Sequence, residues 1–188
     1  MTKELLAASF LAAAAAVSLT GCFPVVVAGA GTAVMMANDR RTTGIQVEDE
    51  NIELKVAQQD FGRAHINATS YNRRVLLTGE AIDEAARASI EQKVRNIASV
   101  KEVVNEIQVA GNASLSSRSG DTLVTSNVKT RMVNNPKFNV LRVKVVTEAG
   151  TVYLMGLVTP EEGDAAVEIA RTTSGVSRVV NAFEYIGK

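Results

Sequence analysis

Two stretches of the chain carry the same order of apolar and polar positions. "LLTGEAIDEAARASIEQKVRNIASVKEVVNEIQV" occupies 76–109, and "YLMGLVTPEEGDAAVEIARTTSGVSRVVNAFEYI" occupies 153–186. The glycines Gly79 and Gly156 match at an offset of 77 residues, and the two "VVN" triplets match at an offset of 76. Two copies are too few for a solenoid, so the pattern predicts a tandem pair of small domains. The Gly-, Ser- and Asn-rich residues 111–120 between them are typical of a linker.

The second copy predicts the order helix, strand, strand, helix, strand. Asp121 is suited to cap the first helix, and Thr159 followed by Pro160 is suited to begin the second. The predicted elements are a helix from Asp121 to about Asn134, a hairpin around 148–150, a helix from Thr159 that Gly175 can close, and a strand over 179–185.

The first copy predicts the same order. Its elements are a helix over 51–61, a hairpin made by 65–71 and 74–78, and a second helix whose apolar stripe is Ile90, Val94 and Ile97. This αββαβ order predicts an α+β fold in which two helices cover one face of a three-stranded mixed sheet. Because a domain of about 65 residues is only marginally stable alone, we expect the two domains to dock.

The composition narrows the chemistry. Apolar residues make up 46% of the chain, but with five Phe, three Tyr and no Trp the cores must be mainly aliphatic. Twenty basic and twenty acidic residues balance, so nothing in the overall charge indicates a nucleic-acid partner. One Cys and one His exclude an internal disulfide and a His-rich metal site. No pattern combines nucleophile, base and oxyanion donors, so we expect no catalytic residue, no metal and no cofactor.

The first residues resemble an export signal. Lys3 precedes a fifteen-residue apolar stretch, 5–19, which is shorter than a transmembrane helix and suits a signal peptide. Leu19-Thr20-Gly21-Cys22 then resembles the bacterial lipobox, in which the thiol of the cysteine receives diacylglycerol and the new amino terminus receives a further acyl chain such as palmitate. We therefore expect Cys22 to be lipidated and to anchor the chain in a membrane.

Two other interpretations of this segment stay open. The signal could be an ordinary secretory one with an incidental cysteine, or residues 5–37 could form one long apolar anchor. The lipobox interpretation predicts a signal peptide at 1–21 and a lipidated tether at 22–44. Phe23 follows the cysteine where an inner-membrane retention signal would place Asp, which implies sorting to the outer membrane.

The repeated motifs resemble a known domain. The αββαβ order with "LTG…VVN" in one copy and "LMG…GVSRVVN" in the other resembles the BON domain, here expected at 45–110 and 121–188. A lipobox followed by two such copies is similar to the dual BON-domain lipoproteins of the outer membrane. The resemblance implies a periplasm-facing, non-enzymatic protein that binds anionic phospholipid through its second BON domain. It also implies a role in outer-membrane integrity and enrichment at the division site.

The charge distribution agrees with lipid binding by the second copy. Residues 111–150 contain six basic and two acidic residues, whereas residues 45–110 contain eight basic and eleven acidic ones. Each Lys or Arg near an anionic leaflet contributes about 1 kcal/mol, provided that these side chains share one face. The first helix of the second copy lies inside the positive stretch.

This helix divides into two faces at 100° per residue. Val124, Val128 and Met132 recur every four residues and predict the core face. The opposite face, our predicted lipid-binding site, comprises Leu123, Ser126, Asn127, Lys129, Thr130, Val133 and Asn134. The alternative is an ordinary solvated face with two tolerated apolar residues. The best-known member type of the family carries an aromatic residue where Leu123 stands, so lipid affinity through this position is an open question.

A second function class follows from the first copy. Acidic residues cluster around its predicted first helix, namely Glu48, Asp49, Glu50, Glu53 and Asp60. Anionic lipid should repel such a face, so this domain would support the second one or bind a protein. The alternative function is therefore a protein-interaction adapter for outer-membrane assembly or division machinery, with the acyl chains only as a tether.

Overall fold

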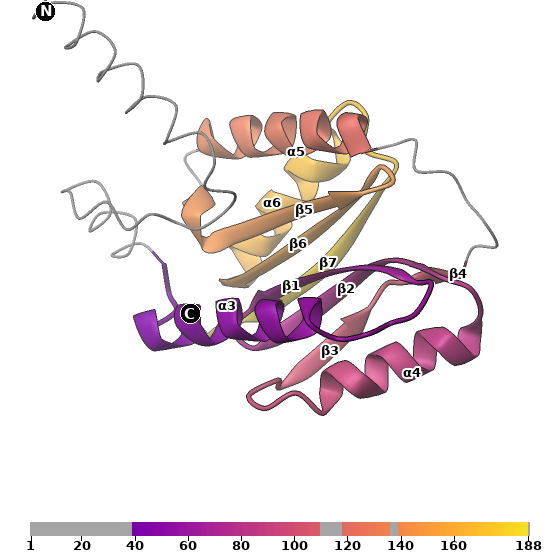
Figure 1. Ribbon diagram of the computed structural model, residues 1–188. Coiled ribbons are helices and arrows are strands. Elements are labelled where there is room, and N and C mark those ends of the chain that lie inside the picture. The colour runs from indigo at the N-terminus through magenta and orange to yellow at the C-terminus, as the bar shows by residue number, and fades with distance from the viewer. Residues whose placement is uncertain (1–38, 110–117, 136–138, 188) are drawn as a thin grey trace, which may run out of the picture. The chain divides into compact units, whose positions relative to one another are not determined.

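The computed structural model describes residues 39–109, 118–135 and 139–187 (Figure 1). The predicted signal peptide at 1–21, Cys22, and most of the predicted tether and linker lie outside these residues, so lipidation of Cys22 stays a prediction. Within the described part, no helix is long and apolar enough to cross a membrane.

The first domain has the predicted αββαβ order. Its elements are α3 (Thr43–Ala57), β1 (His65–Tyr71), β2 (Arg74–Ala81), α4 (Glu84–Arg95), β3 (Glu102–Asn105) and β4 (Gln108–Val109). β1 is antiparallel to β2, and β3 and β4 are both parallel to β2 in the same register. The expected third strand is therefore broken in two, and Ile107 in the break is buried in the core of this domain.

The predicted helix at 51–61 is wrong in its position. α3 begins at Thr43, after Thr42 whose hydroxyl accepts a hydrogen bond from the Ile45 amide, and it ends at Ala57. The first half of this helix has no clear apolar stripe because its buried residue is Asp49, which is 3% exposed. Apolar periodicity alone could not reveal such a turn.

The second domain repeats the order without a broken strand. Its elements are α5 (Arg118–Val133), the short 3₁₀ helix η2 (Val140–Arg142), β5 (Val143–Glu148), β6 (Thr151–Val158), α6 (Pro160–Arg171) and β7 (Arg178–Tyr185). β5 is antiparallel and β7 parallel to β6. The predicted start of α6 is confirmed: Thr159 is its N-cap, and Glu162 completes a capping box. The α+β fold of two αββαβ domains is thus confirmed.

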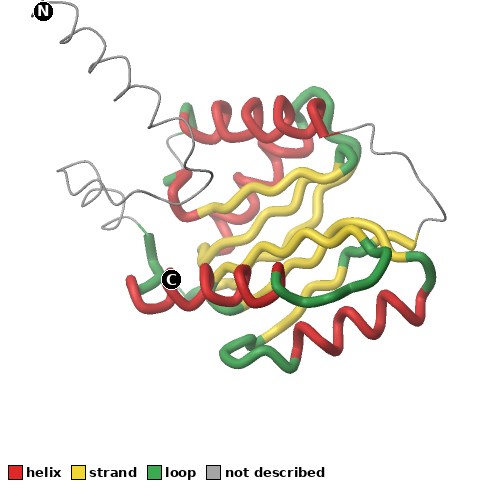
Figure 2. The backbone as a smooth tube through the Cα atoms, in the orientation of Figure 1, coloured by secondary structure: helices red, strands yellow, loops and turns green. Residues whose placement is uncertain are grey.

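The two sheets pack face to face, and the helices flank them (Figure 2). Side chains alternate along the central strands: Val152 and Leu154 point to the helices, whereas Tyr153 and Met155 point to the other sheet. The contact between the sheets is a cluster of Tyr71, Leu76, Tyr153, Met155, Leu157 and Ala182. Strands buried on both faces explain the uninterrupted apolar runs in the sequence, and the expected docking of the domains is confirmed.

The repeated glycine has a structural reason in both domains. A Cβ on Gly79 would lie 2.0 Å from the carbonyl oxygen of His65, and one on Gly156 would lie 2.4 Å from that of Arg142. In each domain, a carbonyl group at the start of the first strand lies directly against this glycine of the central strand. Glycine therefore permits a close backbone approach that a side chain would block.

Candidate functional site

α5 is fixed to the second domain by the face that periodicity predicts. Val128 and Met132 are fully buried and Val124 is 8% exposed, all within the cluster that includes β5, β6 and α6. Thr125 adds a hydrogen bond of 2.7 Å to Thr147 on β5. Arg131 donates to the Ile169 carbonyl oxygen at 3.0 Å, on the side of α6. The helix therefore presents one defined face outward.

The outward face carries two exposed aliphatic side chains. Leu123 is 67% exposed and Val133 is 65% exposed, among the most exposed large apolar residues of the described chain. The other five predicted lipid-binding residues are exposed too: Ser126, Asn127, Lys129, Thr130 and Asn134. The structure thus brings six of the seven predicted residues to one face of α5, and Asn134 follows directly after the end of the helix. Lipid binding by this face stays a prediction.

The predicted cap of α5 has a different role. The helix begins at Arg118, so Asp121 lies within its first turn and not at the N-cap. Its carboxylate is buried and accepts hydrogen bonds from the amides of Ala149 (2.9 Å) and Gly150 (2.8 Å). Both turn residues have positive φ, 48° and 74°, as a tight two-residue hairpin requires. Asp121 therefore holds the β5–β6 turn against α5.

Asp49 is the equivalent residue of the first domain. It accepts hydrogen bonds from the amides of Asn72 (2.8 Å) and Arg73 (2.7 Å), which form the β1–β2 turn with φ of 54° and 66°. The hydroxyl of Ser70 donates to it as well, at 2.7 Å. The charge pattern predicted Asp49 as part of an acidic surface. The one sequence signal for its role at the turn is that both copies have an Asp three residues before a buried aliphatic residue.

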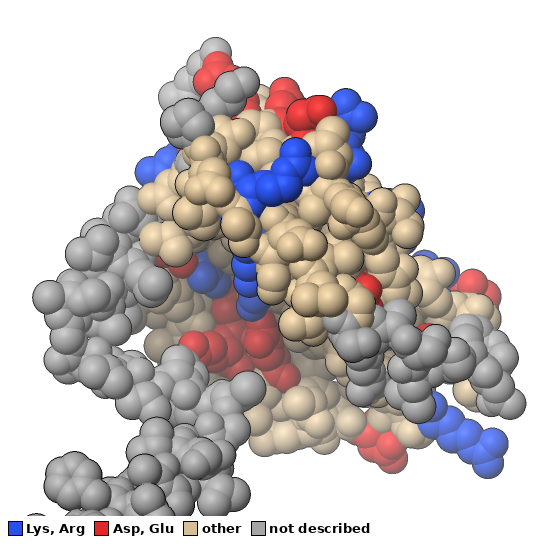
Figure 3. Space-filling view, turned by 90° about the horizontal axis from the view of Figure 1, so that it is seen from above, with Lys and Arg blue, Asp and Glu red and all other residues tan. Residues whose placement is uncertain are grey.

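The predicted acidic face of the first domain is mostly occupied by internal contacts. Glu53 accepts from the Ser70 amide at 2.7 Å and from Lys144 of the second domain at 2.9 Å. Glu48 faces Arg73 at 3.6 Å. Figure 3 shows the acidic side chains gathered in a hollow with basic ones beside it. A cavity of about 360 Å³ there is lined by Asp49, Glu50 and Glu53 together with Arg41 and Lys144.

The positive stretch of the second domain does not form one basic face. Arg142 pairs with Glu162 at 2.8 Å, and Lys144 pairs with Glu53 at 2.9 Å. Among the basic side chains described in this stretch, Lys129 and Arg131 form no ion pair with a described residue. Arg131 donates instead to the Ile169 carbonyl oxygen and to the Thr173 hydroxyl. Two of the four basic side chains described in this stretch are thus neutralised within the protein.

A polar cavity flanks Lys129 on the side of the first domain. Its volume is about 410 Å³, and its lining joins α5 to the edge strand β1 and to the end of β5. The carboxylates in its wall are engaged: Glu148 accepts from Asn67 at 3.0 Å, and Asp121 holds the hairpin. A larger hollow is lined by Asn135, which follows α5, and by Glu161, Asp164 and Glu168 of α6. Carboxylates therefore line both hollows.

Comparison with known proteins assigns the family. A family model described as the BON domain matches residues 48–111 and 120–187. The chain belongs to the BON-domain family. It contains two BON domains, as the repeat predicts, and the second match includes α6 and all but the first two residues of α5.

Two curated relatives extend over most of the chain. It is 35% identical over 178 residues to the outer membrane lipoprotein DolP of Haemophilus influenzae, with 92% of each chain covered. It is 34% identical over 154 residues to a 21 kDa hemolysin of Actinobacillus pleuropneumoniae, with 79% of each covered. The C-terminal domain of CdsD, a type III secretion structural protein of Chlamydia trachomatis, overlaps at a TM-score of 0.31 and 13% identity, over 76% of this chain and 98% of that one.

Proposed function

We propose that this protein is a non-enzymatic, lipid-anchored component of the outer membrane that faces the periplasm and binds anionic phospholipid through the outward face of α5. Through this contact it maintains the integrity of the membrane. The observation that carries the proposal is the exposure of Leu123 and Val133 on a helix that is otherwise fully fixed. Buried in the headgroup region, two aliphatic side chains contribute several kcal/mol of binding free energy, about 1.5–3 kcal/mol each.

Three further points support it. DolP of Haemophilus influenzae is by its name an outer membrane lipoprotein, and the similarity extends over 92% of this chain. The lipobox ending at Cys22 provides the anchor. Lys129, exposed on the same face, favours an anionic headgroup by about 1 kcal/mol.

The test is co-sedimentation with vesicles of pure zwitterionic or mixed anionic phospholipid. Residues 39–188 are used, because the apolar residues 24–37 could bind vesicles themselves. The Leu123→Glu variant should weaken binding to anionic vesicles by about ten- to a hundredfold, since a Leu is lost from the membrane and a charge is added. Leu54→Glu is the matched control, because Leu54 is 56% exposed on α3 of the other domain.

Equal loss in both variants, or binding unchanged in Leu123→Glu, would contradict the assignment to α5. Because Arg142 and Lys144 are paired internally, added salt should weaken binding less than the Leu123→Glu substitution does. A strong salt effect with no effect of the substitution would place the membrane contact on basic side chains elsewhere in the chain.

A protein-interaction adapter is the second candidate. Val47 and Leu54 are 51% and 56% exposed, and they lie seven residues apart on α3, which places them on one side of that helix. Such a pair favours contact with an outer-membrane assembly or division protein, and enrichment at the division site would follow from this contact. Loss of cellular function in Leu54→Glu, with vesicle binding intact, would support the adapter.

A further inference from the structure

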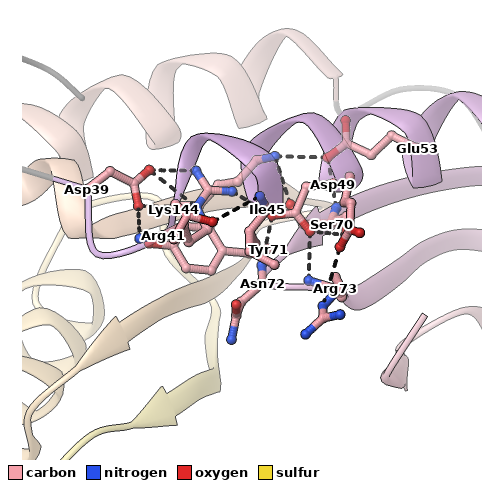
Figure 4. A network of polar contacts seen from close by, with 12 residues as sticks. Asp39, Arg41, Ile45, Asp49, Glu53, Ser70, Tyr71, Asn72, Arg73 and Lys144 are labelled. Carbon is pink, nitrogen blue, oxygen red and sulfur yellow. Dashed lines mark hydrogen bonds and ion pairs between the residues drawn. The ribbon is translucent and has the colours of Figure 1, made fainter. Parts of the chain in front are cut away.

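The residues just before α3 contact both domains. Asp39, Arg40 and Arg41 belong to the predicted tether and precede the first element of the first domain. Yet Arg40 reaches α6 of the second domain, 122 residues further along the chain. Arg41 contacts the first domain through Asp49 and Tyr71, as Figure 4 shows. Three consecutive residues therefore bridge the two BON domains.

Arg40 binds where β6 ends and α6 begins. Its Nη1 donates to the Leu157 carbonyl oxygen at 2.8 Å and to the Glu162 carboxylate, and its Nη2 donates to Glu162 at 3.1 Å. Burial by itself would raise the pKa of Glu162, but hydrogen bonds from two arginines and a backbone amide outweigh it and lower the pKa to about 2. The carboxylate is thus ionised at neutral pH, and the forked contact is the strong, directional kind.

Arg41 lies over the edge of the contact between the sheets. Its guanidinium is 3.9 Å from the ring centroid of Tyr71, and its Nη1 donates to Asp49 at 2.8 Å. Asp39 holds the guanidinium from the other side at 2.7 Å. Tyr71 belongs to the cluster that joins the two sheets, so Arg41 shields that cluster from water.

We propose that residues 39–41 are a strap that fastens the two BON domains to each other at the point where the chain leaves the tether. Arg40 binds the second domain, and Arg41 binds the first and caps the core between them. The strap sets the orientation of α5 relative to the first domain. It also fixes the point at which a membrane anchor pulls on the protein, directly on the seam between the domains. This inference does not depend on lipid binding by α5.

The test is a distance measurement between spin labels on the two domains. Lys55→Cys on α3 and Asn127→Cys on α5 place labels at exposed positions, in the chain from residue 22 onward with Cys22→Ser. The parent should give one narrow distance distribution. Arg40→Ala with Arg41→Ala should broaden that distribution toward longer distances, although the apolar contact between the sheets still joins the domains. The control is Arg63→Ala, an exposed arginine just before β1, which should leave the distribution unchanged.

A narrow and unshifted distribution in the double variant would overturn the strap. If the double variant loses its far-ultraviolet circular dichroism, Arg40→Lys replaces it, because Lys keeps the charge but cannot make the forked contact with Glu162. That variant should broaden the distribution while its helix content stays native. A distribution as narrow as the parent's would then overturn the proposal.

Discussion

Removing the carboxylate of Asp121 should destabilise the second domain through a turn that lies far away in the sequence. In the Asp121→Ala variant, the amides of Ala149 and Gly150 lose charge-assisted hydrogen bonds of 2.9 and 2.8 Å. Each such bond contributes about 1.5 kcal/mol or more. Because Ala149 is exposed and its amide can bind water instead, we expect a combined loss of about 2 kcal/mol.

A graded series separates this role from simple loss of a polar residue. Asp121→Asn keeps one acceptor oxygen and should cost about 1 kcal/mol, half of the Ala variant. Asp49→Ala should cost about 4 kcal/mol, because Asp49 is 3% exposed and also binds Ser70 and Arg41. Asp164→Ala is the control, since Asp164 is exposed on α6 and should change stability by about 0.5 kcal/mol at most.

The assay is urea unfolding of residues 39–188 followed by circular dichroism at constant pH. The slope of free energy against urea should stay the same, so that a shifted midpoint reports stability. In thermal unfolding, the same loss of about 2 kcal/mol should lower Tm by about 4–8 °C in a chain of this size. An Asp121→Ala variant within error of the Asp164→Ala control would refute the claim that Asp121 holds the β5–β6 turn.

Three further substitutions or conditions test the fold in the same assay. Gly156→Ala should strongly lower the free energy of unfolding, because the new Cβ would lie 2.4 Å from the Arg142 carbonyl oxygen. Gly120→Ala in α5 is the control: its Cβ would meet no atom within 4 Å, and the substitution should stabilise by about 0.5–1 kcal/mol. Folding lowers the pKa of Glu162 from 4.5 to about 2, so its contribution of up to about 3 kcal/mol to the free energy of unfolding should be lost as the pH falls through this range. Glu162→Gln should reduce this pH dependence but not abolish it, because the pKa values of Asp39 and Glu91 are lowered too. Leu76 lies between the sheets and is 1% exposed, so Leu76→Ala should lower the free energy of unfolding by about 2–5 kcal/mol. The two domains should then unfold in two separate steps, and a single step would contradict sheet packing as the main link between them.

Periodicity predicted the elements that have an apolar stripe. The face of α5 with Val124, Val128 and Met132 is buried as expected, because the same 3.6-residue period sets both the sequence pattern and the contact. The start of α6 was predicted because Thr159 caps, and Pro160 begins, the helix that directly follows them. Such signals depend only on neighbouring residues, so they can be recognised in a single sequence.

The errors concern partners that are distant along the chain. Asp121 looks like a helix cap because Asp is common there, but its partners are 28 and 29 residues away, on the turn. Lys144 looks like part of a basic surface, but Glu53 lies 91 residues away and neutralises it. Charge counted along a sequence cannot distinguish a surface charge from an internal pair. The outward face of α5 is exposed as predicted, the surrounding basic surface is partly lost to ion pairs, and lipid binding there stays a prediction.

The two hairpin-holding aspartates show why the copies differ in what they expose. With Asp49 aligned to Asp121, the core positions of α3 and α5 coincide, Ile52 with Val124 and Val56 with Val128. The next position differs between the domains. Glu53 of the first domain binds Lys144 of the second, whereas the aligned Thr125 binds Thr147 within its own domain. The outward position differs as well, since Asn51 stands where α5 has Leu123. The duplication thus keeps the residues that fold each domain and changes those that face outward. α3 therefore contributes Glu53 to the contact between the domains, whereas α5 exposes Leu123 and Val133, the two most exposed large apolar side chains of the described residues.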